Sequence, residues 1–377
     1  MVSIKIQISD NEGSAAWDFP MKDSELADKL KSIGSGNKVP SSGIIWPKGL
    51  GMLRELAVSM DELNFLAKSL ERLNDSEYSQ FMAAASLEKS PDLERLINLS
   101  FNVSRYTVIR DVSDWTGTGK RHLLNIQGSL SKAELETIDF TQVGRDLLSS
   151  GRGIPTEYGL LFENEEVPFQ QVYDGTVFPL MDREDAIAVV HMHYMEKTEY
   201  LYLPEEDISI EKALKRLEAP CRSDCTMEIE LLSYEDEIWL DILQQVFDQA
   251  GLEDANTLAG VLSRKDLDAH SLLYIADYAE TLEADEIRKL ADHFHDFIIM
   301  DGAETCADVG EYITQHEPGY QIGEYIEDFV DFNKLGKYIV DERDGKFMGS
   351  CFICMKDNCD LEQIMWDAPE GIEFGGM

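Results

Sequence analysis

The sequence predicts an α+β fold: a multi-domain chain of small mixed sheet-and-helix units and short helical bundles, internally duplicated. Hydrophobic residues make up 44% of the 377 residues, which is enough to bury sizeable cores. They alternate with polar residues in some segments and recur every three or four residues in others, as in strands and amphipathic helices. The order of these segments in the first half returns in the second half, which indicates a repeated architecture.

The first copy is predicted to span residues 1–165 and to begin with an α+β unit at 1–55. Apolar residues alternate from Val2 to Ile8, which is the period of a strand, and a short helix is expected from Asp23. The stretch from Ile33 to Gly51 is rich in glycine, proline and serine. Because these residues interrupt regular structure, a long loop is expected there.

A helical part is expected at residues 56–103. Ser59 can cap a helix, Glu62 follows three residues later, and leucines from Leu63 to Leu73 form one apolar stripe. A second α+β unit is expected at residues 104–165. It begins with a β-prone segment from Tyr106 and ends with a turn followed by the strand-like Tyr158-Gly-Leu-Leu-Phe.

The second copy is predicted at residues 186–356 in the same order. Its parts are an α+β unit at 186–232, helices at 233–295 and an α+β unit at 296–356. Within it we expect a strand from His191 to Leu203, a helix from Ser209 to Leu217 and a strand from Thr226 to Leu232. Residues 166–185 form a partly packed linker between the copies, and residues 357–377 are expected to be a frayed tail.

The duplication depends on collinear matches rather than on high identity. Pro20 matches Pro204 at a spacing of 184 residues, and Gly119 matches Gly310 at 191. Ile138-Asp-Phe-Thr-Gln-Val-Gly matches Val330-Asp-Phe-Asn-Lys-Leu-Gly at 192. In the same alignment, Cys351-Phe-Ile-Cys-Met takes the place of Tyr158-Gly-Leu-Leu-Phe.

The chain carries 73 Asp and Glu against 33 Lys and Arg, a formal net charge of -40. A field this negative argues against direct contact with nucleic acid or anionic lipid. The beginning of the sequence has no basic segment followed by an apolar core, and apolar runs such as Ala186–Val190 are too short to span a bilayer. All six cysteines lie in the second half, which fits reduced thiols. We therefore expect a cytoplasmic protein without membrane contact.

The charge is unevenly distributed. Residues up to 185 carry a net charge of -10, and the remainder carries -30. Two windows, Ser223–Ser263 and Leu290–Asn333, contain no Lys or Arg and hold ten and eleven acids. One interpretation is an acidic face kept for solubility. The other is imitation of DNA, because forty charges at one per roughly 1.7 Å match roughly 70 Å of duplex.

Three segments of the first copy form a recognisable set. They are Asn11-Glu-Gly-Ser followed by Trp17, the stretch LERLINLSFN from Leu93, and Asp139-Phe-Thr-Gln-Val-Gly-Arg-Asp-Leu with Tyr158-Gly a little later. Together they resemble the ArdA family of antirestriction proteins. Asp331-Phe-Asn-Lys-Leu-Gly-Lys is the equivalent in the second copy. The likeness covers nearly all of the first 165 residues and, more weakly, residues 190–355.

The resemblance implies a three-part, elongated, acidic protein that mimics bent B-form DNA and occupies the DNA-binding site of type I restriction-modification enzymes. Such proteins help mobile elements to enter a new host. Family members have about the length of one copy and act as dimers. The tandem chain is therefore expected to be either a homodimer or a monomeric pseudo-dimer.

In this hypothesis the protein is not an enzyme, and acids of the second copy supply phosphate-like charge to the partner. The alternative is an acidic interaction protein for another DNA-binding partner, such as a CRISPR effector, a nucleoid protein or a relaxase. The expected partner-binding acids are Glu228, Glu230, Glu235, Asp236, Glu237, Asp241, Asp248, Asp292, Asp296, Asp308, Glu311, Glu324, Glu327, Asp328 and Asp331.

Other motifs are incomplete, and we expect no cofactor, no metal and no catalytic residue. Thr116-Gly-Thr-Gly-Lys-Arg departs from a phosphate-binding loop at Asp114 and Arg121. A metal-dependent enzyme is a third alternative, but neither histidine nor cysteine pairs form a complete ligand set. The residues in question are His191 and His193 with Cys221 and Cys225, Cys351 and Cys354 with Cys359, and His293 with His295.

Overall fold

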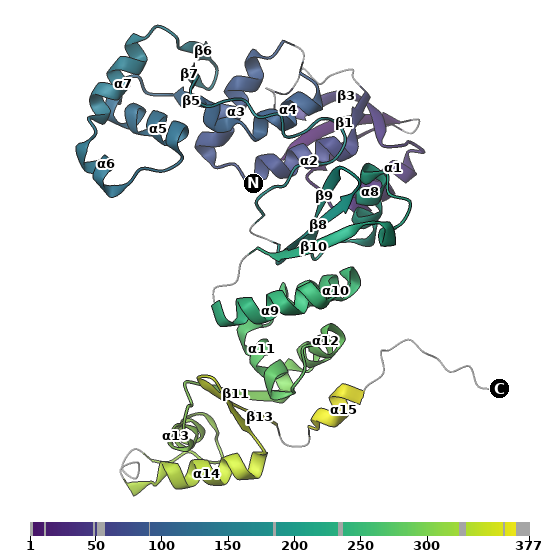
Figure 1. Cartoon of the computed structure of the whole chain (residues 1–377), viewed down its shortest axis with the longest axis vertical. Coiled ribbons are helices and arrows are strands. Elements are labelled where there is room, and N and C mark those ends of the chain that lie inside the picture. The colour runs from purple at the N-terminus through teal and green to yellow at the C-terminus, as the bar shows by residue number, and fades with distance from the viewer. Residues whose placement is uncertain are drawn as a thin grey trace, which may run out of the picture. The chain divides into compact units, whose positions relative to one another are not determined.

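The computed structural model describes residues 3–10, 13–47, 50, 57–89, 91–183, 186–232, 237–323, 329–356 and 359–366. The chain divides into two compact units (Figure 1). The first comprises Met1–Arg183, Met192–Tyr200 and Glu206–Thr226. The second comprises Glu184–His191, Leu201–Glu205 and Met227–Met377. The predicted α+β class is confirmed.

The first unit begins with a sheet of strand order β2-β1-β3-β4. The alternation predicted for the first strand is confirmed, because Ile4, Ile6 and Ile8 are all buried. A short helix follows the second strand at the predicted position. The elements are β1 (Ile4–Asp10), β2 (Gly13–Phe19), α1 (Asp23–Ser32), β3 (Lys38–Trp46) and β4 (Ala57–Ser59).

The long loop predicted from Ile33 to Gly51 is wrong, because β3 lies within it. This strand pairs with β1 in antiparallel fashion, and the register shifts twice along the pair, between Lys5 and Ile6 and between Gln7 and Ile8. Bulges of this kind accommodate glycine inside a strand. Pairing with two neighbouring strands therefore outweighs the local signal of the glycine-rich sequence.

A layer of helices follows, as predicted. Ser59 accepts a hydrogen bond from the backbone N–H of Glu62 and so caps the first of these helices. Leu63, Leu66 and Leu70 are fully buried, which confirms the predicted stripe. The helices are α2 (Met60–Glu71), α3 (Asp75–Leu87) and α4 (Leu93–Ser100).

The last part of the first copy is a small sheet of order β5-β7-β6 with three helices. The rejected phosphate-loop motif, Thr116 to Arg121, lies inside α5, so it is not a loop. The elements are β5 (Tyr106–Ile109), α5 (Trp115–Gln127), α6 (Lys132–Thr137), α7 (Phe140–Ser149), β6 (Ile154–Thr156) and β7 (Gly159–Glu163).

The second copy begins with a sheet of order β10-β8-β9 and a helix. The single strand predicted from His191 to Leu203 is wrong: two strands flank a turn at Met195 and Glu196. Met195 has φ of 54°, a left-handed conformation that glycine or asparagine usually supplies, so the sequence carries no turn signal. The elements are β8 (Ala188–Tyr194), β9 (Lys197–Leu203), α8 (Asp207–Leu217) and β10 (Thr226–Leu231).

Helices and a closing α+β module make up the rest of the second unit. The residues expected to form a frayed tail include a short helix, whose Ile364 is buried and whose Met365 carbonyl accepts a hydrogen bond from Lys289 at 2.8 Å. The elements are α9 (Glu237–Gln249), α10 (Leu252–Leu262), α11 (Ala269–Tyr278), α12 (Ala284–Asp292), β11 (Phe297–Asp301), α13 (Cys306–His316), α14 (Phe332–Arg343), β12 (Lys346–Met348), β13 (Cys351–Met355) and α15 (Leu361–Trp366).

The closing modules of the two copies share topology and register. The order β11-β13-β12 repeats β5-β7-β6. Lys346 pairs with Ile353, as Ile154 pairs with Leu161, at a constant spacing of 192 residues. By this spacing Cys351 is equivalent to Gly159 of the first copy. The predicted match of Cys351 with Tyr158 is therefore wrong by one residue. A one-residue shift exchanges the two faces of a strand, so the correction decides which side chains are equivalent.

The matched glycines explain why both modules pack alike. A Cβ on Gly144 would lie 1.9 Å from the carbonyl oxygen of Trp115, and one on Gly336 would lie 1.6 Å from that of Cys306. Gly119 and Gly310 have equally close contacts across the same pairs of helices. The helices α5 and α7, and likewise α13 and α14, can therefore approach closely only because glycine lies at the crossing.

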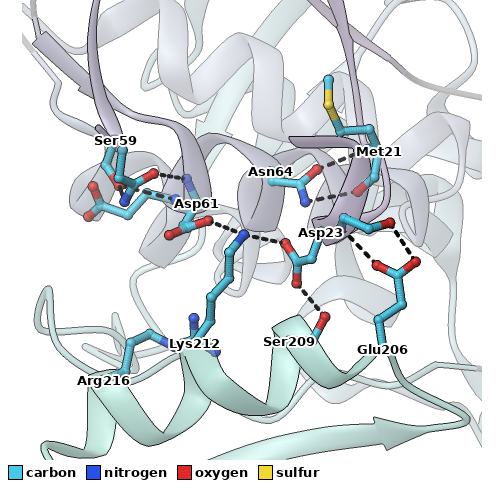
Figure 2. A network of polar contacts seen from close by, with 12 residues as sticks. Met21, Asp23, Ser59, Asp61, Asn64, Glu206, Ser209, Lys212 and Arg216 are labelled. Atoms are coloured by element: carbon cyan, nitrogen blue, oxygen red, sulfur yellow. Dashed lines mark hydrogen bonds and ion pairs between the residues drawn. The ribbon is translucent and has the colours of Figure 1, made fainter. Parts of the chain in front are cut away.

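The helix α8 of the second copy docks on α1 and α2 of the first copy, within the first unit (Figure 2). Lys212 Nζ lies 2.8 Å from Asp23 Oδ1 and 2.7 Å from Asp61 Oδ1. Ser209 donates a hydrogen bond to Asp23, and the backbone N–H of Ser24 donates one to Glu206. These contacts explain why part of the second copy belongs to the first compact unit.

The predicted linker is packed against the first copy. Tyr173 is 3% exposed, and its backbone N–H donates a hydrogen bond to Asn98 Oδ1. Its hydroxyl donates one to Glu62. None of the helices in the described part of the chain has the length and apolarity needed to cross a bilayer.

Candidate acidic interface

The predicted partner-binding acids all belong to the second compact unit. Those that the structure describes lie on β10, α9, α12 and α13, in the turn after α12 and directly before α14. Five of the predicted acids, Glu235, Asp236, Glu324, Glu327 and Asp328, lie outside the described residues, as does the side chain of Glu237.

The strand β10 presents two of these acids on one face. Glu228 and Glu230 are exposed and alternate with the half-buried Met227 and Ile229, because side chains along a strand point to opposite faces. The carboxylate of Glu230 lies 3.1 Å from Nε2 of His191 on the neighbouring strand β8.

The helix α9 presents two more acids on its polar side. Asp241 and Asp248 are exposed, whereas Leu243 and Phe247 are fully buried. Asp248 accepts a hydrogen bond from Gln244 Nε2 at 2.7 Å. Because seven residues make almost two helical turns, the two carboxylates lie on the same side of the helix, about 10 Å apart along its axis.

Two predicted acids stabilise the starts of helices: Asp331 is the N-cap of α14, and Asp308 completes a capping box with Thr305, the N-cap of α13. Asp308 accepts hydrogen bonds from the backbone N–H and the hydroxyl of Thr305, and these bonds hold the pKa of its carboxyl below the ordinary value. Asp331 accepts one from the backbone N–H of Lys334, at the start of α14. Asp139 does the same for α7 at the equivalent position of the first copy. These carboxylates therefore stabilise helix ends.

Two further predicted acids are bound by cations or imidazoles. Asp292 Oδ1 lies 2.8 Å from Nη1 of Arg264, which also binds Asp266 at 3.0 Å. Asp296 lies 2.8 Å from Nδ1 of His293. Both carboxylates thus have a partner within the chain.

Four exposed acids remain, and among the described residues they bind no basic side chain. They are Glu228, Asp241, Asp248 and Glu311. Several basic residues of the same unit are already paired. Arg343 binds Glu317 at 2.6 and 2.7 Å, and Lys346 binds Glu280 at 2.7 Å. Within its described residues the unit therefore exposes carboxylates that its own cations do not bind.

The metal motifs are not assembled in the described residues. No group of three or more His, Cys, Asp or Glu side chains is arranged there to hold an ion. Cys351 and Cys354 are buried in β13, as expected for strand cysteines, and His293 lies at the end of α12 as predicted. His193 Nδ1 lies 2.9 Å from the hydroxyl of Thr198.

Sequence reasoning missed the Lys212 network, because nothing in the local sequence links α8 to residues about 150 to 190 positions earlier. The repeat was the one available signal, since it aligns α1 with α8. The chain matches no protein-family model, and no curated protein is significantly similar to it.

Proposed function

We propose that this protein is a non-enzymatic DNA mimic that occupies the DNA-binding groove of a type I restriction-modification enzyme. The observation that carries the proposal is the charge imbalance of the second half, which holds -30 of the net -40. The exposed carboxylates of Glu228, Asp241, Asp248 and Glu311 have no basic partner among the described residues. A basic groove built for phosphates would supply the missing cations.

The binding energy in this proposal is mainly electrostatic. An acidic protein that enters a basic groove neutralises its lysines and arginines as DNA does, and it speeds encounter through long-range attraction. The separation of about 10 Å between Asp241 and Asp248 along α9 is close to three phosphate steps of about 3.4 Å on one DNA strand. Two acids at that spacing match the periodicity of the ligand they would replace.

The contacts divide the predicted acids into two groups. Glu228, Asp241, Asp248 and Glu311 are available to a partner. Asp308 and Asp331 cap helices, so their replacement would damage α13 and α14 directly. The proposal therefore places the interaction on the first group.

The test is inhibition of DNA cleavage by a purified type I restriction-modification complex. We expect the variant E228Q/D241N/D248N/E311Q to inhibit at least about tenfold more weakly, because four charge contacts of about 0.4 kcal/mol each already amount to that factor. The matched control, E136Q/D146N/E157Q/E166Q, removes four exposed acids of the first compact unit. It should inhibit nearly as well as the native chain.

Both variants should retain the native melting temperature, since the eight side chains are exposed. If the two variants inhibited equally well, the four acids of the second unit would have no special role in binding the enzyme. A native chain that leaves the type I enzyme active but displaces DNA from a CRISPR effector, a nucleoid protein or a relaxase would retain mimicry and overturn the choice of partner.

A further inference from the structure

A groove of about 850 Å³ lies in the first unit, apart from the acids discussed above. Three segments line it: residues 172–180 of the packed linker, the β8–β9 turn with adjoining strand residues, and the end of α8. The volume is within the range of sites that hold a small ligand or a few side chains of a peptide.

Phe178 forms the floor of this groove and is packed from behind. The ring of Phe178 stacks on that of Phe65 with centroids 4.3 Å apart, and the guanidinium of Arg216 lies 4.6 Å from the Phe178 centroid. Arg216 donates to Glu199 at 2.9 Å, and Glu199 also accepts a hydrogen bond from the Phe178 backbone N–H. Glu199 is 1% exposed. The ion pair of Arg216 with the buried Glu199 and the aromatic stack thus hold Phe178 in place before anything binds.

The edge of the groove exposes large apolar side chains. Met195 is 86% exposed at the β8–β9 turn, and Leu180 is 43% exposed on the linker. The left-handed backbone of Met195 holds this side chain at the turn despite the cost of that conformation for a residue with a Cβ. Methionine is common on surfaces that accept varied apolar partners, because its side chain adapts its shape.

The charged residues at the same edge are mostly acidic. Asp174, Glu196 and Glu218 are exposed. Lys197 is the one basic residue among those that line the groove, and its ammonium is already bound to Glu218 at 2.9 Å. The groove therefore combines apolar surface with unneutralised carboxylates, which is the complement of a cationic, partly apolar ligand.

We propose that this groove binds a short peptide segment of a partner protein in which arginine or lysine residues flank a large apolar side chain. The apolar side chain packs against Met195, Leu180 and the aromatic floor, and the cations meet Asp174 and Glu196. This interaction is independent of DNA mimicry, because it needs apolar contact and uses residues of the first unit.

Isothermal titration of the full chain with three synthetic peptides of equal length tests the proposal. One peptide alternates arginine with leucine and phenylalanine, the second replaces the apolar residues with serine, and the third replaces arginine with glutamate. We expect the first to bind at least tenfold more tightly than the second and the third not to bind. Equal affinity for both basic peptides would show that binding needs only the negative charge of the chain, and it would overturn the proposal.

Variants locate the binding. M195S/L180S should weaken binding of the first peptide at least fivefold. The matched control L87S/V112S replaces two apolar residues that are 42% and 57% exposed elsewhere in the same unit, and it should bind normally. E196K should also weaken binding. A peptide that binds M195S/L180S as tightly as it binds the native chain would exclude the groove. If M195S/L180S still inhibits DNA cleavage as strongly as the native chain does, the two interactions are separate.

Discussion

Lys212 is bound by two carboxylates where α8 contacts the first copy. Its side chain is 15% exposed and lies between Asp23 and Asp61, whose side chains are 16% and 22% exposed. Burial alone would lower the pKa of Lys212, but the two carboxylates outweigh burial and raise it. The ammonium is therefore ionised at neutral pH and joins α8 to two helices of the first copy.

Replacing Lys212 by methionine should destabilise the first unit by about 2 to 4 kcal/mol, because two poorly exposed carboxylates lose their shared cation. Urea unfolding measures the change, and hydrogen exchange of α1 and α8 shows where it acts. The control K5M breaks an ion pair with Asp18 whose partners are about half exposed, and it should cost less than about 1 kcal/mol. Equal losses for both variants would contradict this interpretation.

Asp23 should make this contact sensitive to acid. Burial would raise its pKa, but Lys68, Lys212 and Ser209 together hold it below the ordinary value of 3.8. A depressed carboxyl pKa contributes stability above the unfolded pKa and loses it as the pH falls through the folded pKa. The native chain should therefore be more stable than D23N from pH 7 to about pH 4, and the difference should shrink below pH 3.8.

Urea unfolding of both proteins at several pH values measures that difference. D18N, which lacks a half-exposed ion pair, should show a small difference from the native chain throughout. A D23N difference that stays constant down to pH 3 would show that ionisation of Asp23 does not stabilise the contact.

Residue patterns predicted which acids are exposed but not what each one binds. Alternation along β10 and helical periodicity along α9 were sufficient to place Glu228 and Asp241 on the surface. The role of Asp308 at the start of α13 could have been predicted, because Thr305 precedes it by three residues as in a capping box. Ion pairs such as Asp292 with Arg264 join different elements, so no local pattern predicts them.

Glycines at the crossings of α5 with α7 and of α13 with α14 determine how closely these helices pack. Introducing alanine at Gly144 or Gly336 should destabilise the corresponding module by at least about 2 kcal/mol, because the added methyl would overlap a backbone carbonyl of the facing helix. Hydrogen exchange of the two facing helices measures the loss in each module. G319A, where no atom lies within 4 Å of the added Cβ, should leave stability nearly unchanged.

Elements with a strong internal pattern were predictable, and those defined by pairing were not. The strand of β1 and the leucine stripe of α2 follow from their own periodicity. The strand β3 exists because β1 and β4 pair with it, and the β8–β9 hairpin turns at Met195, which gives no turn signal. Strand pairing rather than local composition determines both elements, so neither follows from the residues of its own segment.

At the scale of the whole molecule, the uneven charge predicts strong salt dependence. Exposed charges are screened within about 8 Å at physiological ionic strength, so attraction to a basic groove must weaken as salt rises. Inhibition of the type I enzyme should fall at least about tenfold between 50 and 200 mM NaCl. The variant E228Q/D241N/D248N/E311Q should show a shallower dependence, and an unchanged slope would mean that other acids carry the interaction.

In the proposed function, the protein and DNA compete for the same groove of the enzyme. The most direct test of this competition is displacement of a fluorescent duplex from a purified type I restriction-modification complex, followed by anisotropy as the native chain is added. We predict complete displacement, with a midpoint that rises in proportion to the DNA concentration. Inhibition of cleavage while the duplex stays bound, or no displacement at saturating protein, would contradict DNA mimicry.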